Sequence, residues 1–176
     1  MQRLVDFIFK ILEFAIVVLL AGMAIMVFGN VVLRYGFNSG ITWSEEMSRY
    51  FFVWLTFTGA VVTFRDNAHL GVETVVRLFG RTGRQVCMLL TNLIILFGAG
   101  VFFWGTWLQH DINASMTGAV IGIPMIWVFG IGYFTSLGIG LIAVVRIIRL
   151  LTGDISEEEL GAFAGEHEAS VREQAG

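Results

Sequence analysis

Few residues of this chain could do chemistry, and the densest group of them opens its second apolar run: Glu45, Glu46 and Arg49. Arg49 follows the two carboxylates at i+4 and i+3, so we expect a local charge cluster that lowers the cost of burying these groups. At 100° per residue, a mostly polar or small stripe follows one side of the predicted helix: Glu45, Arg49, Phe52, Thr56, Gly59 and Thr63. A membrane helix with charge and small residues along one stripe is typical of a contact with protein rather than with lipid.

Other kinds of chemistry lack a suitable set of residues. His69, His110 and His167 lie in predicted loops or in the tail, where they could not hold a heme inside the membrane. No ionisable residue falls near the middle of an apolar run, where ion-coupled transport by this chain alone would need one. Cys87 is the single cysteine, and neither a nucleophile–base pair nor a metal-ligand cluster is evident. We therefore expect no enzyme and no cofactor in this chain, and the net charge of −3 indicates no nucleic-acid partner.

Composition predicts an all-α integral membrane protein. The chain has 176 residues, of which 56% are hydrophobic. We expect a transmembrane domain over residues 1–152, with spans at about 11–33, 45–64, 86–108 and 124–145. The second apolar run is continuous only from Tyr50 to Phe64, about 22 Å of helix against a hydrocarbon core of roughly 30 Å, so it must draw in flanking charges to cross. Residues 153–176 form an acidic tail that we expect to be mobile.

Basic residues predict that both termini lie in the cytoplasm. With the N-terminus inside, only Arg34 and Arg49 of the span-flanking residues fall on the outer side, which the positive-inside rule favours. The basic residues placed inside are Arg3, Lys10, Arg65, Arg77, Arg81, Arg84, Arg146 and Arg149. Tryptophans near the outer ends of the spans would form an interfacial aromatic belt. These are Trp43, Trp104, Trp107 and Trp127.

The connections also carry patterns. Apolar residues from Val72 to Phe79 have the spacing of a short amphipathic helix, which we expect to lie on the cytoplasmic membrane surface. An ordinary solvated loop helix is the alternative. Gly118 and Gly122 precede Pro124, so we expect them in a loop that enters the fourth span.

Small residues predict packing faces on the last two spans. Gly132, Ser136 and Gly140 repeat at i+4 in the fourth span and would let another backbone approach closely. In the third span Cys87, Thr91, Gly98 and Gly105 share one side. We expect both faces to pack the helices of this chain on one another.

Ordered motifs resemble a known family. They are Asn30–Tyr35 (NVVLRY), Trp43–Tyr50 (WSEEMSRY), Phe52–Ala60 (FVWLTFTGA) and Arg65–Leu70 (RDNAHL). This series resembles the DctQ-like small membrane subunit of tripartite ATP-independent periplasmic (TRAP) transporters. The four-span layout and the entry at Gly122-Ile123-Pro124 extend a weaker resemblance to about Leu150, whereas the acidic tail does not match.

The resemblance implies a three-part importer in the inner membrane of a prokaryote. A periplasmic binding protein captures an organic acid, such as a dicarboxylate or a sugar acid like sialic acid. A large membrane subunit moves the acid inward by symport with sodium, and the small subunit braces the large one. The substrate and sodium sites belong to the large subunit, so the resemblance assigns neither to this chain.

Site residues follow as hypotheses from the resemblance and the stripe together. The predicted contact with the large subunit consists of Arg34, Glu45, Glu46, Arg49, Phe52, Thr56, Gly59 and Thr63. The predicted anchors at the outer leaflet are Trp43, Tyr50, Trp104, Trp107 and Trp127. The predicted inner corner and its contacts with anionic lipid head groups involve Arg65, Asp66, His69, Arg77, Arg81 and Arg84. Topology control alone would explain these arginines equally well.

Two other functions remain open at this point. A self-sufficient transporter or channel, working as a homo-oligomer, would need a polar pore-lining face, and only the second helix comes close to one. A membrane-embedded enzyme or electron-transfer subunit would show a heme spectrum or a bound metal, which the histidine positions argue against.

Overall fold

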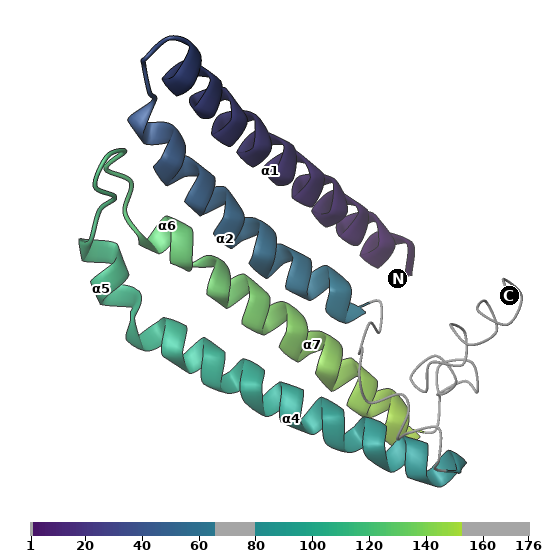
Figure 1. Ribbon diagram of the computed structural model, residues 1–176. Helices are drawn as coiled ribbons and strands as arrows, with labels where there is room; N and C mark the ends of the chain where they lie inside the picture. Colours follow the sequence, from purple (N-terminus) through teal and green to yellow (C-terminus); the bar gives the residue numbers. More distant parts are fainter. Residues whose placement is uncertain (1, 66–79, 153–176) are drawn as a thin grey trace, which may run out of the picture. The chain divides into compact units, whose positions relative to one another are not determined.

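The structure, a computed structural model, describes residues 2–65 and 80–152, and Figure 1 labels its helices along the chain. The helices are α1 (Gln2–Gly36), α2 (Thr42–Arg65), α4 (Arg81–Leu108), α5 (His110–Ser115), α6 (Ile126–Phe129) and α7 (Ile131–Thr152). Each predicted span therefore coincides with a helix, and the fourth is interrupted at Gly130 between α6 and α7. The predicted surface helix at Val72–Phe79 and the acidic tail lie outside the described residues.

Three helices in the described ranges are long and apolar enough to cross a membrane: Val5–Gly36, Arg81–Leu108 and Ile126–Thr152. They confirm the all-helical class and make three of the predicted spans candidate membrane-spanning helices. α2 is a 24-residue helix, about 36 Å long, but its charges and hydroxyls leave it outside that group. A crossing by α2 and cytoplasmic termini stay predictions.

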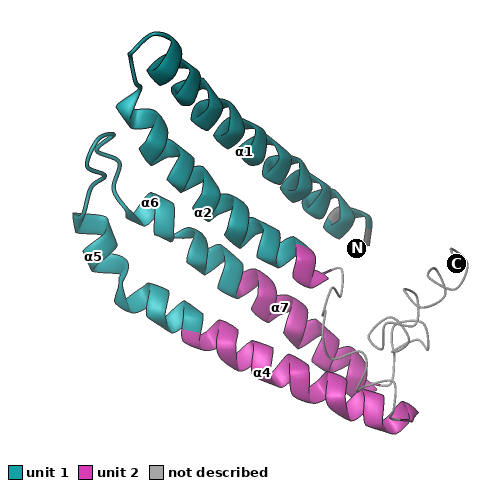
Figure 2. Ribbon diagram, in the orientation of Figure 1, with its two compact units in different colours: residues 1–62, 102–136 teal, residues 63–101, 137–176 magenta. Residues whose placement is uncertain are grey.

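The chain divides into two compact units, coloured separately in Figure 2. Unit 1 contains residues 1–62 and 102–136, and unit 2 contains residues 63–101 and 137–176. In unit 1, α1 and α2 form a helical hairpin. Its turn includes Asn38 in the left-handed region at φ +50°, a conformation that asparagine adopts more readily than most residues.

Side-chain hydrogen bonds fix this turn. Asn30 on α1 accepts the backbone N–H of Ile41 through Oδ1 at 2.8 Å. The buried hydroxyl of Ser44 donates to the carbonyl of Met26 at 2.9 Å. Both bonds join the first turns of α2 to the last turns of α1, so the start of α2 is held in place before its charged residues begin.

The rest of unit 1 packs the start of α7 against α2 and the end of α4. The rings of Phe57 and Phe102 stack with centroids 5.6 Å apart, and the hydroxyl of Thr135 donates to the carbonyl of Phe57 at 3.3 Å. A Cβ added at Gly132 would lie 2.7 Å from Oγ1 of Thr106. The predicted packing role of Gly132 within this chain is thereby confirmed, because only a glycine permits this approach.

Unit 2 contains the end of α2, most of α4 and most of α7. A Cβ at Gly140 would be in ordinary contact, 3.9 Å from the side chains of Leu96 and Ala99, which confirms that this face packs on α4. The third-span prediction is wrong, since a Cβ at Gly98 or Gly105 would meet nothing within 4 Å. α4 instead buries Met88 and Asn92, a different side of the helix.

An arginine on α7 closes the end of α2 within unit 2. Nη2 of Arg146 donates to the carbonyls of Phe64 and Arg65 at 2.9 and 2.8 Å, and its guanidinium lies 4.8 Å from the centroid of the Phe64 ring. The last carbonyls of a helix lack hydrogen-bond donors within the helix, and the guanidinium of Arg146 supplies a donor to two of these carbonyls. Sequence analysis counted Arg146 only as a topology residue.

Candidate partner-binding surface on helix α2

The stripe predicted on α2 is exposed, and the opposite side of the helix is covered. Glu45, Arg49, Thr56 and Thr63 are exposed, Phe52 is 55% exposed, and Gly59 is half-buried. The residues on the covered side are buried or half-buried: Phe51, Val53, Phe57, Thr58, Val61 and Val62. Residues 2–65 and 80–152 therefore leave a polar, small-residue face of α2 exposed, along a helix that also carries apolar residues.

Glu46 is the exception among the predicted contact residues, because it is only 4% exposed. Its Oε2 accepts the backbone N–H groups of Val120 and Ile121 at 2.8 and 3.0 Å. Its Oε1 accepts the hydroxyl of Tyr50. We call this arrangement the Glu46 clamp. Glu46 is therefore not exposed with the rest of the stripe, because it is engaged inside unit 1. The contact with the large subunit predicted for Glu46 and the anchoring role predicted for Tyr50 stay predictions.

The clamp holds a short hairpin, residues 116–125, which joins α5 to α6. The N–H of Met125 donates to the carbonyl of Met116, and the N–H of Gly118 donates to that of Ile123, both at 2.9 Å. Gly122 has φ +73°, a region that favours glycine. The prediction that Gly118 and Gly122 lie in a loop is confirmed.

Gly118 leaves the space that the side chains of the Glu46 clamp occupy. A Cβ at this position would overlap the carboxylate of Glu46 and the hydroxyl of Tyr50. The glycine spacing therefore has a reason that sequence analysis missed. No local pattern pairs Glu46 with two amides that lie 74 and 75 residues further along the chain.

The predicted ion pairs of Arg49 with Glu45 and Glu46 do not form in the described part of the chain, although Arg49 remains close enough to attract the Glu46 carboxylate. Glu45 lies instead 3.8 Å from the guanidinium of Arg34, in a pair whose side chains are 64% and 69% exposed. Within residues 2–65 and 80–152, no ion pair joins Arg49 to either carboxylate. The reason is geometric, because the α1–α2 turn brings Arg34 to Glu45, while the 116–125 hairpin occupies Glu46.

The tryptophans predicted as anchors are largely exposed, but they do not share one level along α2. Trp43 and Trp54 are eleven residues apart on α2, about 16 Å of helix. The indole N–H of Trp54 donates to the carbonyl of Trp127 at 3.1 Å, which places Trp127 beside Trp54. A single membrane interface could hold both Trp43 and Trp127 only if α2 were strongly tilted.

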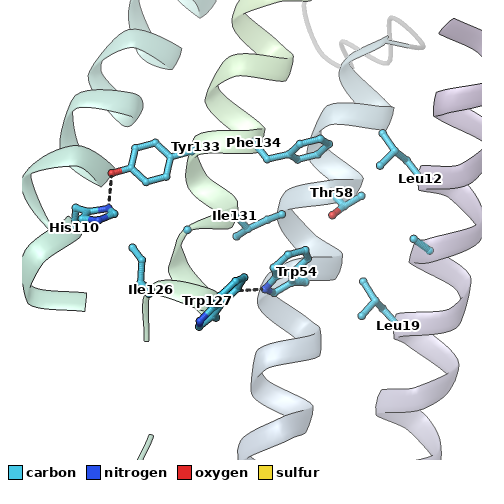
Figure 3. Close-up of a pocket in the computed structure, with 12 residues that line it drawn as sticks. Leu12, Leu19, Trp54, Thr58, His110, Ile126, Trp127, Ile131, Tyr133 and Phe134 are labelled. Atoms are coloured by element: carbon cyan, nitrogen blue, oxygen red, sulfur yellow. Dashed lines mark hydrogen bonds between the residues drawn. The ribbon is translucent and has the colours of Figure 1, made fainter. Parts of the chain in front are cut away.

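An apolar cavity of about 500 Å³ lies in unit 1, where Leu12 and Leu19 of α1 face Trp54 and Thr58 of α2 (Figure 3). Residues of α6 and α7 complete its wall, and at one edge Nδ1 of His110 lies 3.2 Å from the hydroxyl of Tyr133. The lining offers hydrocarbon contact and few polar groups. Within the described ranges, no group of three or more histidine, cysteine, aspartate or glutamate residues could hold a metal ion.

The inner corner is described only in part. Arg65 ends α2 and is half-buried, and Arg81 and Arg84 lie in the first turn of α4. Asp66, His69 and Arg77 lie outside the described residues. The predicted roles of all these residues stay predictions.

The sequence matches a described family over most of its length. Residues 23–153 match the family "Tripartite ATP-independent periplasmic transporters, DctQ component". A TRAP transporter small permease protein of Haemophilus influenzae is 39% identical over 153 residues, which cover 86% of this chain and 92% of that protein. The chain belongs to the DctQ family.

Other relatives agree with this membership. A second TRAP small permease protein of H. influenzae is 25% identical over 84% of this chain and 90% of its own length. The C4-dicarboxylate TRAP transporter small permease protein DctQ of Vibrio cholerae is 28% identical over 60% of this chain and 47% of its own length. As a DctQ family member with apolar spanning helices, the chain is a transport component in a membrane, and the exposed stripe of α2 lies inside the matched region.

Proposed function

We propose that this chain is the non-catalytic small permease subunit of a sodium-coupled, binding-protein-dependent importer of organic acids, and that it acts as a scaffold for the large membrane subunit. The exposed stripe of α2 is the contact surface. The chain crosses the inner membrane four times with both termini in the cytoplasm. The acid is a dicarboxylate or a sugar acid, and sodium is bound by the large subunit.

The observation that carries the proposal is the exposure of the stripe on an otherwise apolar protein. Thr56 and Thr63 are exposed on α2, and the Thr56 hydroxyl is already bonded to the carbonyl of Phe52 at 2.8 Å. Gly59 has open space where a Cβ would stand, so another backbone could approach there. Contact with lipid would not stabilise these threonines and this glycine. Small and hydroxyl-bearing residues are instead enriched where membrane helices pack on one another.

The outer half of α1 supports the same contact. Ile25 and Phe28 are each 71% exposed, on the part of α1 that hydrogen bonds accepted by Asn30 and Met26 join to the start of α2. The proposed partner would cover apolar residues of α1 together with the stripe of α2. A DctQ component is by its description one part of a tripartite transporter, which supports a large membrane subunit as this partner.

Family membership and charge support the remaining parts of the proposal. One relative, from V. cholerae, is named for C4-dicarboxylates, which supports an organic acid as the imported substrate. The excess of arginines placed at the inner ends of the helices supports cytoplasmic termini. Arg65, Arg81 and Arg84 would then lie near anionic head groups. A periplasmic binding protein would deliver the acid to the outer side.

Bulky substitutions on the stripe test the contact. Thr56→Trp and Gly59→Trp should lower the amount of large subunit that co-purifies with this chain by at least about tenfold, the factor that corresponds to 1.4 kcal/mol. The indole would separate two backbones that the proposal places in close contact. The matched control is Phe97→Trp on α4, which is 74% exposed and lies outside the proposed surface.

The control should leave the complex intact. Full complex yield with both stripe variants would refute the proposed contact. If the stripe variants instead disrupt a homo-oligomer, and the purified chain alone transports solute in liposomes, the chain is a self-sufficient transporter.

A further inference from the structure

Arg49 is the one charged residue of the stripe without an ion-pair partner in the described part of the chain, and its attraction to the buried carboxylate of Glu46 acts over a longer distance. Arg49 is exposed, and within residues 2–65 and 80–152 no ion pair involves it. The carboxylates closest to it along α2 are both engaged, Glu45 beside Arg34 and Glu46 by Tyr50 and the hairpin amides. A guanidinium has five N–H donors and stays protonated, so the Arg49 side chain needs hydrogen-bond acceptors.

Arg49 also forms a ridge between two grooves of unit 1. One groove, of about 550 Å³, lies between α2 and the 116–125 hairpin, and its apolar lining includes Val53, Met116 and Val120. The other, of about 530 Å³, lies between α2 and α1 and is of mixed character, because Glu45 and Ser48 line it together with Met23 and Val27. Arg49 and Phe52 line both grooves. A helix laid along α2 would meet a central cation with a depression on either side, one mainly apolar and one partly polar.

We propose that Arg49 binds a carboxylate of the large membrane subunit, carried on a transmembrane helix whose side chains enter the two grooves. This inference rests on the proposed function, because it assumes that the large subunit covers the stripe. A buried guanidinium is stable only when it is paired, and a carboxylate can accept two parallel N–H bonds from it. The proposal therefore names an aspartate or glutamate on the partner at the level of Arg49.

A lipid phosphate is the other anion that could reach Arg49, and the stripe argues against it. Thr56 and Gly59 continue the same side of α2 for another two to three turns, and their small size permits a close backbone approach that acyl chains would not use. A protein helix could pair with Arg49 and pack against these residues together. The two grooves beside Arg49 likewise have room for side chains that a helix presents in successive turns.

Charge and size at position 49 can be separated by three substitutions. Arg49→Lys keeps the charge, Arg49→Met keeps an unbranched side chain without charge, and Arg49→Glu reverses the charge. We measure the large subunit that co-purifies with each variant of the tagged chain from the co-expressed complex. The expected order of yield is wild type, Lys, Met and Glu, with at least a tenfold loss for Arg49→Glu. Thr56→Trp is measured alongside as the test of the contact itself.

Charge reversal on the partner completes the experiment. In the Arg49→Glu background, each acidic residue in the membrane helices of the large subunit is changed to arginine in turn, and one change is expected to restore the complex. Equal yields of Arg49→Glu and Arg49→Met, or no restoring position, would overturn the proposal. If Thr56→Trp still disrupts the complex in that case, the proposed function stands and only the carboxylate is wrong. If Thr56→Trp is also without effect, the proposed function fails as well.

Discussion

Replacing Glu46 with alanine is expected to remove most solute uptake by the assembled transporter, although Glu46 is buried inside unit 1. The substitution leaves the N–H groups of Val120 and Ile121 and the hydroxyl of Tyr50 without their acceptor. Buried donors without an acceptor are costly, so the 116–125 hairpin should leave its place beside α2. The groove that Val120 and Met116 line would then lose its wall. Uptake of the transported acid into cells or proteoliposomes is the measurement.

Glu45→Ala is the matched control for this substitution. Glu45 is the neighbouring carboxylate, but it is exposed, and in the described part of the chain its ion pair is the 3.8 Å contact with Arg34. Exposed ion pairs of this kind contribute about 0–1 kcal/mol, so uptake should stay close to that of the wild type. Equal uptake by the two variants would show that the Glu46 clamp has no part in transport. Glu46→Gln should be intermediate, since an amide can accept through one of its two terminal atoms only.

Replacing Gly132 with valine is expected to destabilise the chain by about 1–3 kcal/mol, the usual cost of overpacking. A Cβ at Gly132 would lie 2.7 Å from Oγ1 of Thr106 and 3.3 Å from Cζ of Phe102. Because the hydroxyl of Thr106 donates to the carbonyl of Phe102 at 2.9 Å, it is not free to turn away without losing that bond. The thermal unfolding midpoint of the purified chain in detergent is the measurement.

Gly98→Val on α4 is the control, because it makes the same change in a helix with open space. Nothing lies within 4 Å of a Cβ at Gly98. Valine is also a better helix former than glycine, so the midpoint should stay the same or rise slightly. Similar destabilisation by both variants would mean that the branched side chain itself, rather than the contact of α7 with α4, sets the effect.

The helices were predictable from the sequence because each rests on a local pattern. Long apolar runs made α1, α4 and α7 evident, and the start of α2 at Thr42 agrees with the charged residues that precede its apolar run. The exposed side of α2 followed from a 100° repeat, which is also local. The family followed from ordered motifs between Asn30 and Leu70, and the match of residues 23–153 confirms it.

The features that sequence analysis missed depend on contacts between distant segments. Two adjacent glutamates looked equivalent, yet Glu45 is exposed and Glu46 is buried by a hairpin 74 residues away. Arg146 was counted as a topology residue, and its bonds to the end of α2 join segments more than 80 residues apart. The packing face predicted from the small residues of α4 was wrong for the same reason, because neighbouring helices decide which side of a helix packs.

Helix α2 carries two kinds of charged residue, which differ in what they contact. Glu46 positions an element of this chain, whereas Arg49 and the stripe are left for another molecule. This separation makes the difference between loss of the hairpin and loss of the partner measurable with single substitutions.

Site-specific cross-linking tests most directly whether a second protein covers the stripe. A photoreactive amino acid at position 56 is introduced into the complete transporter and irradiated in native membrane vesicles, with position 97 on α4 as the control. We expect an adduct of this chain with the large membrane subunit from position 56 and little or none from position 97. Labelling of lipid alone from position 56, with no protein adduct, would contradict it.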